Sequence, residues 1–183
     1  MCILGMTLAF ASLFATLSST QQVFDRHFGL AESFPRWFAV IALLSGFASV
    51  LNARLVVRLG MRAMATGTFA AQTVNSAVMV LLFGANLVPE WAAFWLYFYW
   101  TVTVFFMAGL TIGNLNALAL EPMGHIAGTA ASVVTALATV LSVLVAAPIG
   151  LAFDGTPLPL MVGVFICSAL AVPLMLALPR REG

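Results

Sequence analysis

Residues 91–113 read WAAFWLYFYWTVTVFFMAGLTIG and contain no charged side chain. The hydrocarbon core of a bilayer is about 30 Å thick, and a helix that rises 1.5 Å per residue crosses it in about 20 residues. The stretch is therefore long and apolar enough to cross a membrane as a helix. Similar apolar runs of about 18–25 residues precede and follow it, separated by short segments that hold most of the charge. The sequence predicts a polytopic membrane protein.

The composition supports the same conclusion. Charged residues make up 7% of the 183 residues and hydrophobic residues 63%, with a mean hydropathy of +1.11. A soluble domain usually has about 25% charged residues. The net charge of +1 gives no reason to expect a nucleic-acid partner. The two cysteines, Cys2 and Cys167, are far apart and form no CxxC motif, and no motif indicates a metal or a cofactor.

We predict an all-α fold, because backbone polar groups in lipid must be satisfied within each segment and the chain lacks the alternation of a β-barrel. The predicted domain is a single six-span membrane domain that covers residues 1–183. Its transmembrane helices are predicted at about 3–20, 34–51, 63–83, 91–113, 126–151 and 160–178.

The arginines predict the orientation of these helices. One side of the membrane collects the larger set, Arg54, Arg58, Arg62, Arg180 and Arg181. The other side has only Arg26 and Arg36, mixed with acidic residues. Loops rich in Lys and Arg stay in the cytoplasm, so we expect the first side and both termini to be cytoplasmic.

Two segments on this cytoplasmic side are candidates for a gate. Residues 52–62, NARLVVRLGMR, place Arg54 and Arg58 on one helical face, with Gly60 permitting a tight turn before Arg62. Residues 116–132, NALALEPMGHIAGTAAS, place Glu121 and His125 on either side of a Pro-Gly break. The first segment is either a topological anchor or a gating loop. The second is either a solvated turn or a gate that closes the cytoplasmic side.

Four segments in this order carry a resemblance to a known family: FGL at 28–30, LNARLVVRLGMR at 51–62, ALALEPMGHIAGTAAS at 117–132 and DGTPLP at 154–159. The chain resembles the C-terminal half of drug/proton antiporters of the bicyclomycin-resistance (Bcr/CflA) type, members of the major facilitator superfamily. The resemblance covers residues 3–178, and the stretch 116–132 is its most specific part. It implies two inverted three-helix repeats, which form half of a twelve-helix fold in the bacterial cytoplasmic (inner) membrane.

The spans also contain candidates for a substrate path. In the fifth span, Ser132, Thr135 and Thr139 belong to a stripe of small and polar residues. Such a stripe serves either helix packing or a substrate path, and the resemblance favours the second use because the corresponding helix lines the central cavity in that family. Ser12 and Thr16 lie along one side of the first span.

The fourth span is rich in aromatic residues, and Trp95, Tyr99 and Phe106 align on it. They either face lipid or contact an apolar substrate, because aromatic surfaces adapt to varied apolar molecules. In the third span Gln72, Asn75 and Ser76 fall near the middle of the bilayer. Amides there are costly unless paired, so we expect these three residues to link helices.

No Asp, Glu, Lys, Arg or His lies deep inside a predicted span. We therefore expect any proton site to be supplied by a partner half or by the interfacial residues Asp25, Glu32 or Glu121. The resemblance implies that the coupling carboxylate belongs to the N-terminal half. The first hypothesis is thus half of a transporter that exports hydrophobic small molecules by alternating access, partnered by the bilayer and an N-terminal half or a second copy. The chain has no GxSxG or HExxH motif, so we do not expect an enzyme. The alternatives are a stand-alone six-span protein that self-associates or joins another membrane protein, and a non-functional truncated remnant.

Overall fold

A computed structural model describes residues 1–178, which are almost entirely helical and form no strand. The long helices are α1 (Cys2–Arg26), α2 (Phe34–Leu59), α3 (Met61–Gly84), α4 (Glu90–Leu120), α5 (Ala127–Leu151) and α6 (Leu158–Leu176). Two short 3₁₀ segments complete the fold, η1 (Ala31–Ser33) before α2 and η2 (Glu121–Ile126) between α4 and α5. Each long helix overlaps one predicted span. Arg180 and Arg181, which helped to predict the orientation, lie outside the described residues.

These helices are long and apolar enough to cross a membrane. By length and composition the candidate spans are Cys2–Arg26, Ala31–Leu59, Met61–Gly84, Leu158–Leu176 and the continuous stretch Glu90–Leu151, which contains α4, η2 and α5. The all-α class of the prediction is confirmed, and the fold is compatible with a multi-pass membrane protein.

Several helices extend beyond the predicted spans. α1 continues to Arg26, α2 to Leu59 and α4 to Leu120. The predicted spans end where polar residues begin, but polar residues outside the hydrocarbon layer can still continue a helix. Two such residues link the parts of α2 and α4 that extend beyond the predicted spans. Asn114 on α4 donates a hydrogen bond of 2.6 Å to Asn52 on α2.

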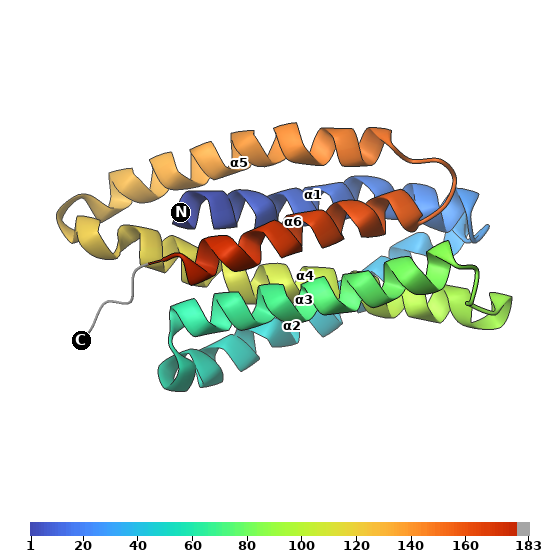
Figure 1. The fold of residues 1–183 in the computed structure, drawn as a ribbon, viewed down its shortest axis with the longest axis horizontal. Coiled ribbons are helices and arrows are strands. Elements are labelled where there is room, and N and C mark those ends of the chain that lie inside the picture. The colour runs from blue at the N-terminus through green and yellow to red at the C-terminus, as the bar shows by residue number, and fades with distance from the viewer. Residues whose placement is uncertain (179–183) are drawn as a thin grey trace.

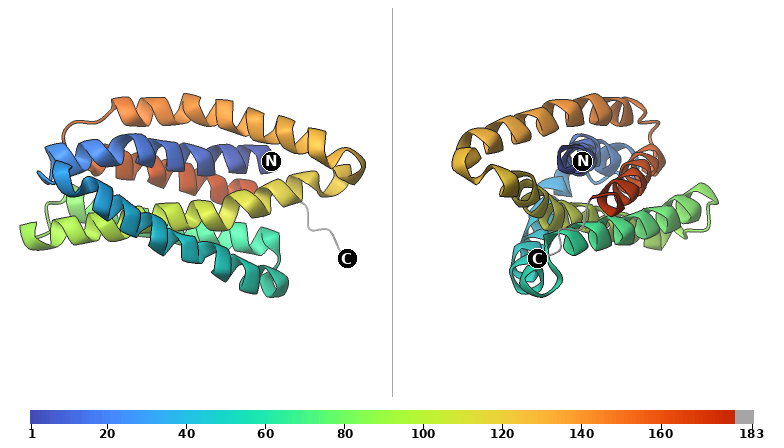
Figure 2. Two further views of the ribbon diagram at one scale, coloured as in Figure 1. Left: turned by 180° about the vertical axis from the view of Figure 1, so that it is seen from behind. Right: turned by 60° about the vertical axis from the view of Figure 1, so that its left-hand side comes forward.

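The helices pack in two layers (Figures 1 and 2). One layer has the order α5, α1, α4, α2, in which each helix packs against the next. The second layer contains α6 and α3, which pack against each other, with α6 also on α1 and α3 also on α4. α1 and α4 are therefore the central helices, and they supply the large buried side chains Phe24, Tyr97 and Trp100.

Small residues bring the helices together, as is usual where lipid tails are as apolar as the side chains. Gly163 on α6 lies so close to Ile149 on α5 that an added Cβ would stand 2.5 Å from that side chain. Gly109 on α4 faces Ala48 on α2, where an added Cβ would be 3.0 Å from the alanine Cβ.

α2 and α5, at the two ends of the first layer, are the least covered helices. α2 buries only Ile41 and Ala48. α5 buries a line of residues spaced four apart, Ala130, Val134, Ala138, Ser142 and Ala146. The remaining faces of both helices are largely exposed, with large apolar side chains such as Leu43 and Leu144.

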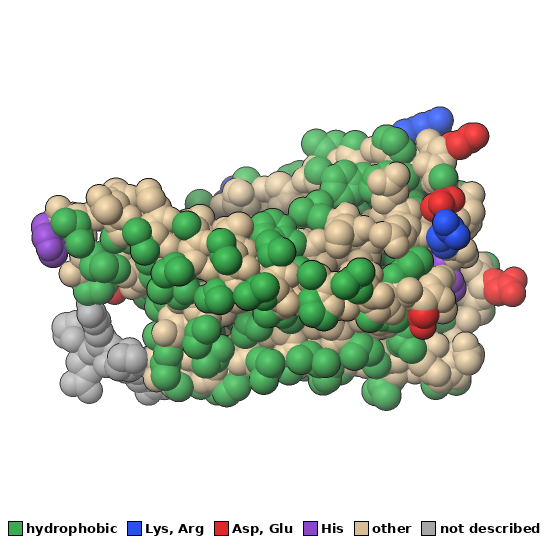
Figure 3. Space-filling model, turned by 90° about the horizontal axis from the view of Figure 1, so that it is seen from above, with side chains coloured by type: hydrophobic (Ala, Val, Ile, Leu, Met, Phe, Trp, Pro, Cys, Tyr) green, Lys and Arg blue, Asp and Glu red, His purple; other side chains and the backbone are tan. Residues whose placement is uncertain are grey.

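Charge lies at the ends of the bundle. On the face shown in Figure 3, acidic and basic side chains gather at one end, and the long band between the two ends is hydrophobic or uncharged. Met1 and the last described residues lie toward the opposite end (Figure 1). The turn between α2 and α3 has Gly60 at φ 80° and ψ 154°, a left-handed conformation that favours glycine. The predicted tight turn at this glycine is therefore present.

Candidate functional site

The predicted gate residue Arg62 fastens one helix end to another. Its Nη2 donates a hydrogen bond of 2.9 Å to the carbonyl of Leu176, and its Nε donates one of 3.3 Å to the carbonyl of Met175. These carbonyls belong to the last turn of α6, where the helix dipole favours a cation. Arg62 therefore holds the start of α3 against the end of α6, a contact that the sequence does not reveal.

A cavity of about 820 Å³ adjoins this contact. Its lining includes three of the predicted gate residues, Gly60, Arg62 and Glu121. Cys2 and Leu176 also line it. The Nη1 atom of Arg62 is buried and has no hydrogen-bond partner among residues 1–178. The cavity thus adjoins the start of α1, the end of α6 and the turns before α3 and α5.

The other predicted gate residues lie outside this cavity. Arg54 and Arg58 are exposed on the last turns of α2, and His125 is exposed in η2. The Pro-Gly break is real, because η2 separates α4 from α5 and Met123 within it has a non-helical backbone. Arg54 and Arg58 are accessible for contact with another protein or with lipid headgroups.

The hydroxyls predicted on α5 do not pack against the rest of the bundle. Ser132 and Thr135 are exposed and Thr139 is half-buried, since the buried line of α5 runs through Ala130 and Ala138 instead. Helix packing within the described residues therefore does not explain Ser132 and Thr135. They lie on an open face of α5.

The two candidates on α1 lie in the packed interior. Ser12 and Thr16 are fully buried. Each hydroxyl donates a hydrogen bond to a carbonyl of its own helix, Ser12 to Leu8 at 2.9 Å and Thr16 to Ser12 at 2.7 Å. Neither residue lines the 820 Å³ cavity or the groove described below, so the conformation seen here keeps both away from a path.

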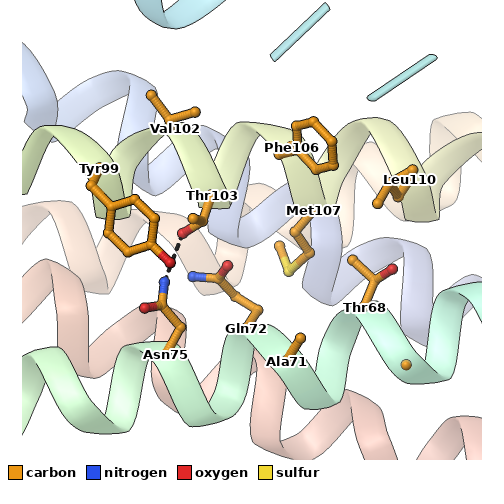
Figure 4. A pocket seen from close by; sticks show the side chains of 11 residues that line it. Thr68, Ala71, Gln72, Asn75, Tyr99, Val102, Thr103, Phe106, Met107 and Leu110 are labelled. Atoms are coloured by element: carbon orange, nitrogen blue, oxygen red, sulfur yellow. Dashed lines mark hydrogen bonds between the residues drawn. The ribbon is translucent and has the colours of Figure 1, made fainter. Parts of the chain in front are cut away.

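The three aromatic candidates on α4 separate into two groups. Trp95 packs edge-on against Trp37 of α2, with ring centroids 5.6 Å apart. Tyr99 and Phe106 instead line a groove of about 420 Å³ between α3 and α4, which we call the α3–α4 groove (Figure 4). Its lining also includes Gln72 and Asn75 from α3.

The polar residues of α3 link it to α4, as predicted. Asn75 donates a hydrogen bond of 2.8 Å to the hydroxyl of Thr103. The Ser76 hydroxyl accepts one of 3.0 Å from the Trp100 ring and one of 3.1 Å from Gln72. The interhelical role is confirmed for Asn75 and Ser76, whereas the bond of Gln72 stays within α3. The groove beside these bonds is not predicted by the sequence, because residue spacing does not show where two helices separate.

At the opposite end of the bundle, the turn before α6 contains one perturbed carboxyl. The hydroxyl and the backbone N–H of Thr156 donate hydrogen bonds of 2.7 and 2.9 Å to Asp154. These bonds stabilise the carboxylate and lower the pKa of Asp154 below its ordinary value.

Comparison with known protein families, curated proteins and solved structures gave no match to this chain. Within residues 1–178, no group of three or more His, Cys, Asp or Glu side chains is placed to hold a metal ion. The described residues thus offer an arginine-held helix end, an open hydroxyl face on α5 and an uncharged groove with amide groups.

Proposed function

We propose that the chain is one half of a transporter that exports apolar small molecules across the bacterial cytoplasmic membrane by alternating access. Both termini lie in the cytoplasm in this proposal. The second half is an N-terminal half of the same transporter or a second copy of the chain. A proton-coupling carboxylate would belong to an N-terminal half, because no Asp, Glu, Lys, Arg or His of this chain lies deep within a predicted span.

The pattern of helix contacts carries the proposal. Exchanging α1, α2 and α3 for α4, α5 and α6 leaves the main contacts unchanged, because α1 packs on α5 as α4 packs on α2, and on α6 as α4 packs on α3. A minor contact between α4 and α5 has no comparable counterpart between α1 and α2. The pairs α1–α4 and α3–α6 map onto themselves. Two inverted three-helix repeats around a pseudo-two-fold axis produce this pattern, and transporter halves are built in this way.

The exposed faces of α2 and α5 agree with a missing second half. In the exchange α2 corresponds to α5, and both lie at the ends of the same layer (Figure 2). The Ser132 hydroxyl donates a hydrogen bond of 3.1 Å to the Gly128 carbonyl of its own helix. Lipid tails could cover the apolar side chains of these faces, but they offer no hydrogen bond to the exposed Thr135. A second protein half or a water-filled path would satisfy the Thr135 hydroxyl.

Efflux of a fluorescent apolar cation such as ethidium from cells tests the transport proposal. We expect cells that express the chain in its native membrane to export the dye faster than cells that lack it. Arg58→Ala should slow efflux several-fold at an equal amount of inserted protein, because the exposed Arg58 would contact the second half on the cytoplasmic side. Arg36→Ala, which removes an exposed arginine at the start of the same helix, is the matched control.

One outcome would contradict transport itself, and another would contradict only the gating role of Arg58. Efflux equal to that of cells without the protein would exclude transport of this dye by the chain. Unchanged efflux by Arg58→Ala, with the control also unchanged, would remove the gating role and leave transport standing.

A further inference from the structure

We propose that the α3–α4 groove binds an uncharged, mostly apolar small molecule that carries one hydroxyl group, such as an alkylphenol. The groove is separate from the exposed faces of α2 and α5, so this inference does not depend on the proposed transport function. Figure 4 shows its side chains converging from the two helices.

The groove lies midway along the helices that form it. Its α3 residues run from Gly67 to Asn75 and its α4 residues from Tyr99 to Leu110, the central parts of both helices. At this depth the surroundings of a membrane-spanning bundle are hydrocarbon. A volume of about 420 Å³ is within the range of sites that bind small molecules.

The polar side chains of the groove are only partly satisfied by the protein. The Gln72 side chain is buried, with only 3% of its surface exposed. Its Nε2 donates a hydrogen bond to the hydroxyl of Ser76. No hydrogen bond to its Oε1 is found among residues 1–178, and this oxygen keeps some accessible surface. The same is true of Asn75 Oδ1, while the amide nitrogen of that residue donates to Thr103.

A hydroxyl group matches these free positions. An amide side chain has one oxygen that accepts and two N–H groups that donate. One N–H of Gln72 is used, so an oxygen and a second N–H remain. A hydroxyl both donates and accepts, whereas a lipid tail does neither and would leave a buried amide unsatisfied at a large cost.

The charge and the walls of the groove define the rest of the ligand. None of the lining residues is charged, so a bound ion would lack a counter-charge in a region of low dielectric. The ligand is therefore neutral. Val102, Phe106 and Met107 form the apolar wall, and the half-exposed ring of Tyr99 stands beside the two amides (Figure 4).

Binding of radiolabelled 4-octylphenol to the full chain in lipid nanodiscs tests this inference, with octylbenzene as the matched compound that lacks the hydroxyl. We expect one saturable site per chain that binds octylphenol at least tenfold more tightly than octylbenzene. Gln72→Met keeps the side-chain length and removes the amide, and it should abolish this preference. Gln21→Met, the same change at an exposed glutamine of α1, should leave it intact.

A second variant keeps the test decisive if Gln72→Met does not fold. Ala71→Trp places a large side chain at the exposed edge of the groove and should eliminate saturable binding of both compounds. Equal affinity for octylphenol and octylbenzene would show an apolar crevice without polar recognition and would overturn the proposal. Absence of saturable binding, or saturable binding that survives Ala71→Trp, would also overturn it.

Discussion

Removing the Ser76 hydroxyl should destabilise the bundle more than removing an equally buried serine hydroxyl elsewhere. Ser76 Oγ is the acceptor for two buried donors, Trp100 Nε1 and Gln72 Nε2. An interhelical hydrogen bond in a membrane protein contributes about 0.6 kcal/mol on average and about 1.7 kcal/mol at most, and a buried unsatisfied donor costs about 1–3 kcal/mol. Because Gln72 can turn toward the groove, we expect Ser76→Ala to cost about 1–3 kcal/mol in total.

Ser168→Ala is the matched control. Ser168 is also fully buried, but its hydroxyl donates only to the carbonyls of Val164 and Phe165 in its own helix. Those carbonyls belong to the backbone ladder of α6, so this loss should cost less than about 0.5 kcal/mol.

Reversible unfolding in mixed detergent and SDS micelles, followed by circular dichroism, measures both free energies of unfolding. A double-mutant cycle of Ser76→Ala with Trp100→Phe should give a coupling energy of about 0.6–1.7 kcal/mol. Equal losses for Ser76→Ala and Ser168→Ala, with no coupling to Trp100, would refute the reasoning that this serine joins α3 to α4.

Three further predictions concern other parts of the bundle. Gly163→Ala should cost about 1–3 kcal/mol of unfolding free energy, because the added Cβ would overlap the side chain of Ile149 on α5. Gly46→Ala is the control and should not destabilise the protein, because an added Cβ there meets nothing within 4 Å. The same detergent titration measures both. Arg62→Gln should cost about 1–2 kcal/mol, because it removes both the arginine bonds to the α6 carbonyls and the cation at that helix end. Arg62→Lys should cost less, because it keeps the cation and loses only the simultaneous contact with both carbonyls; equal losses would remove this explanation. Thr156→Val should raise the pKa of Asp154 toward its ordinary value in a carboxyl NMR titration. Since folding lowers that pKa, these bonds stabilise the fold at pH above the ordinary value, and their contribution is lost as the pH falls through the folded-state pKa.

The sequence was sufficient for the six helices, because an uncharged run of about 20 residues has few alternatives in a membrane. It was less informative about where the helices end. Polar residues such as Asn52 and Asn114 continue their helices and bond to each other, and hydropathy alone cannot distinguish this from a loop.

The sequence predicts a side chain's role best where a polar group lies at membrane depth, because that group must find a hydrogen-bond partner within the protein. Gln72, Asn75 and Ser76 had to find partners at membrane depth, and the latter two bond to α4. The face of α5 was harder to predict, because small residues occur on several sides of it. The structure buries Ala130 and Ala138 and leaves Ser132 and Thr135 open.

The α3–α4 groove and the contact of Arg62 with α6 could not be predicted from spacing. Both depend on how far apart two helices lie, which is set by side chains distant in the sequence. Tyr99 and Phe106 were identified for their aromatic character, and the structure adds the amides of Gln72 and Asn75 beside them.

Photo-crosslinking in native membranes tests the central claim, that another transporter half covers the exposed faces of α2 and α5. A benzophenone amino acid would replace Phe47 on α2, Thr135 on α5 or, as the control, Leu81 on α3, all of which are exposed. We predict that the first two positions crosslink to a six-span segment, either the N-terminal half or a second copy, and that the control reacts only with lipid. Lipid adducts alone at all three positions would contradict the account.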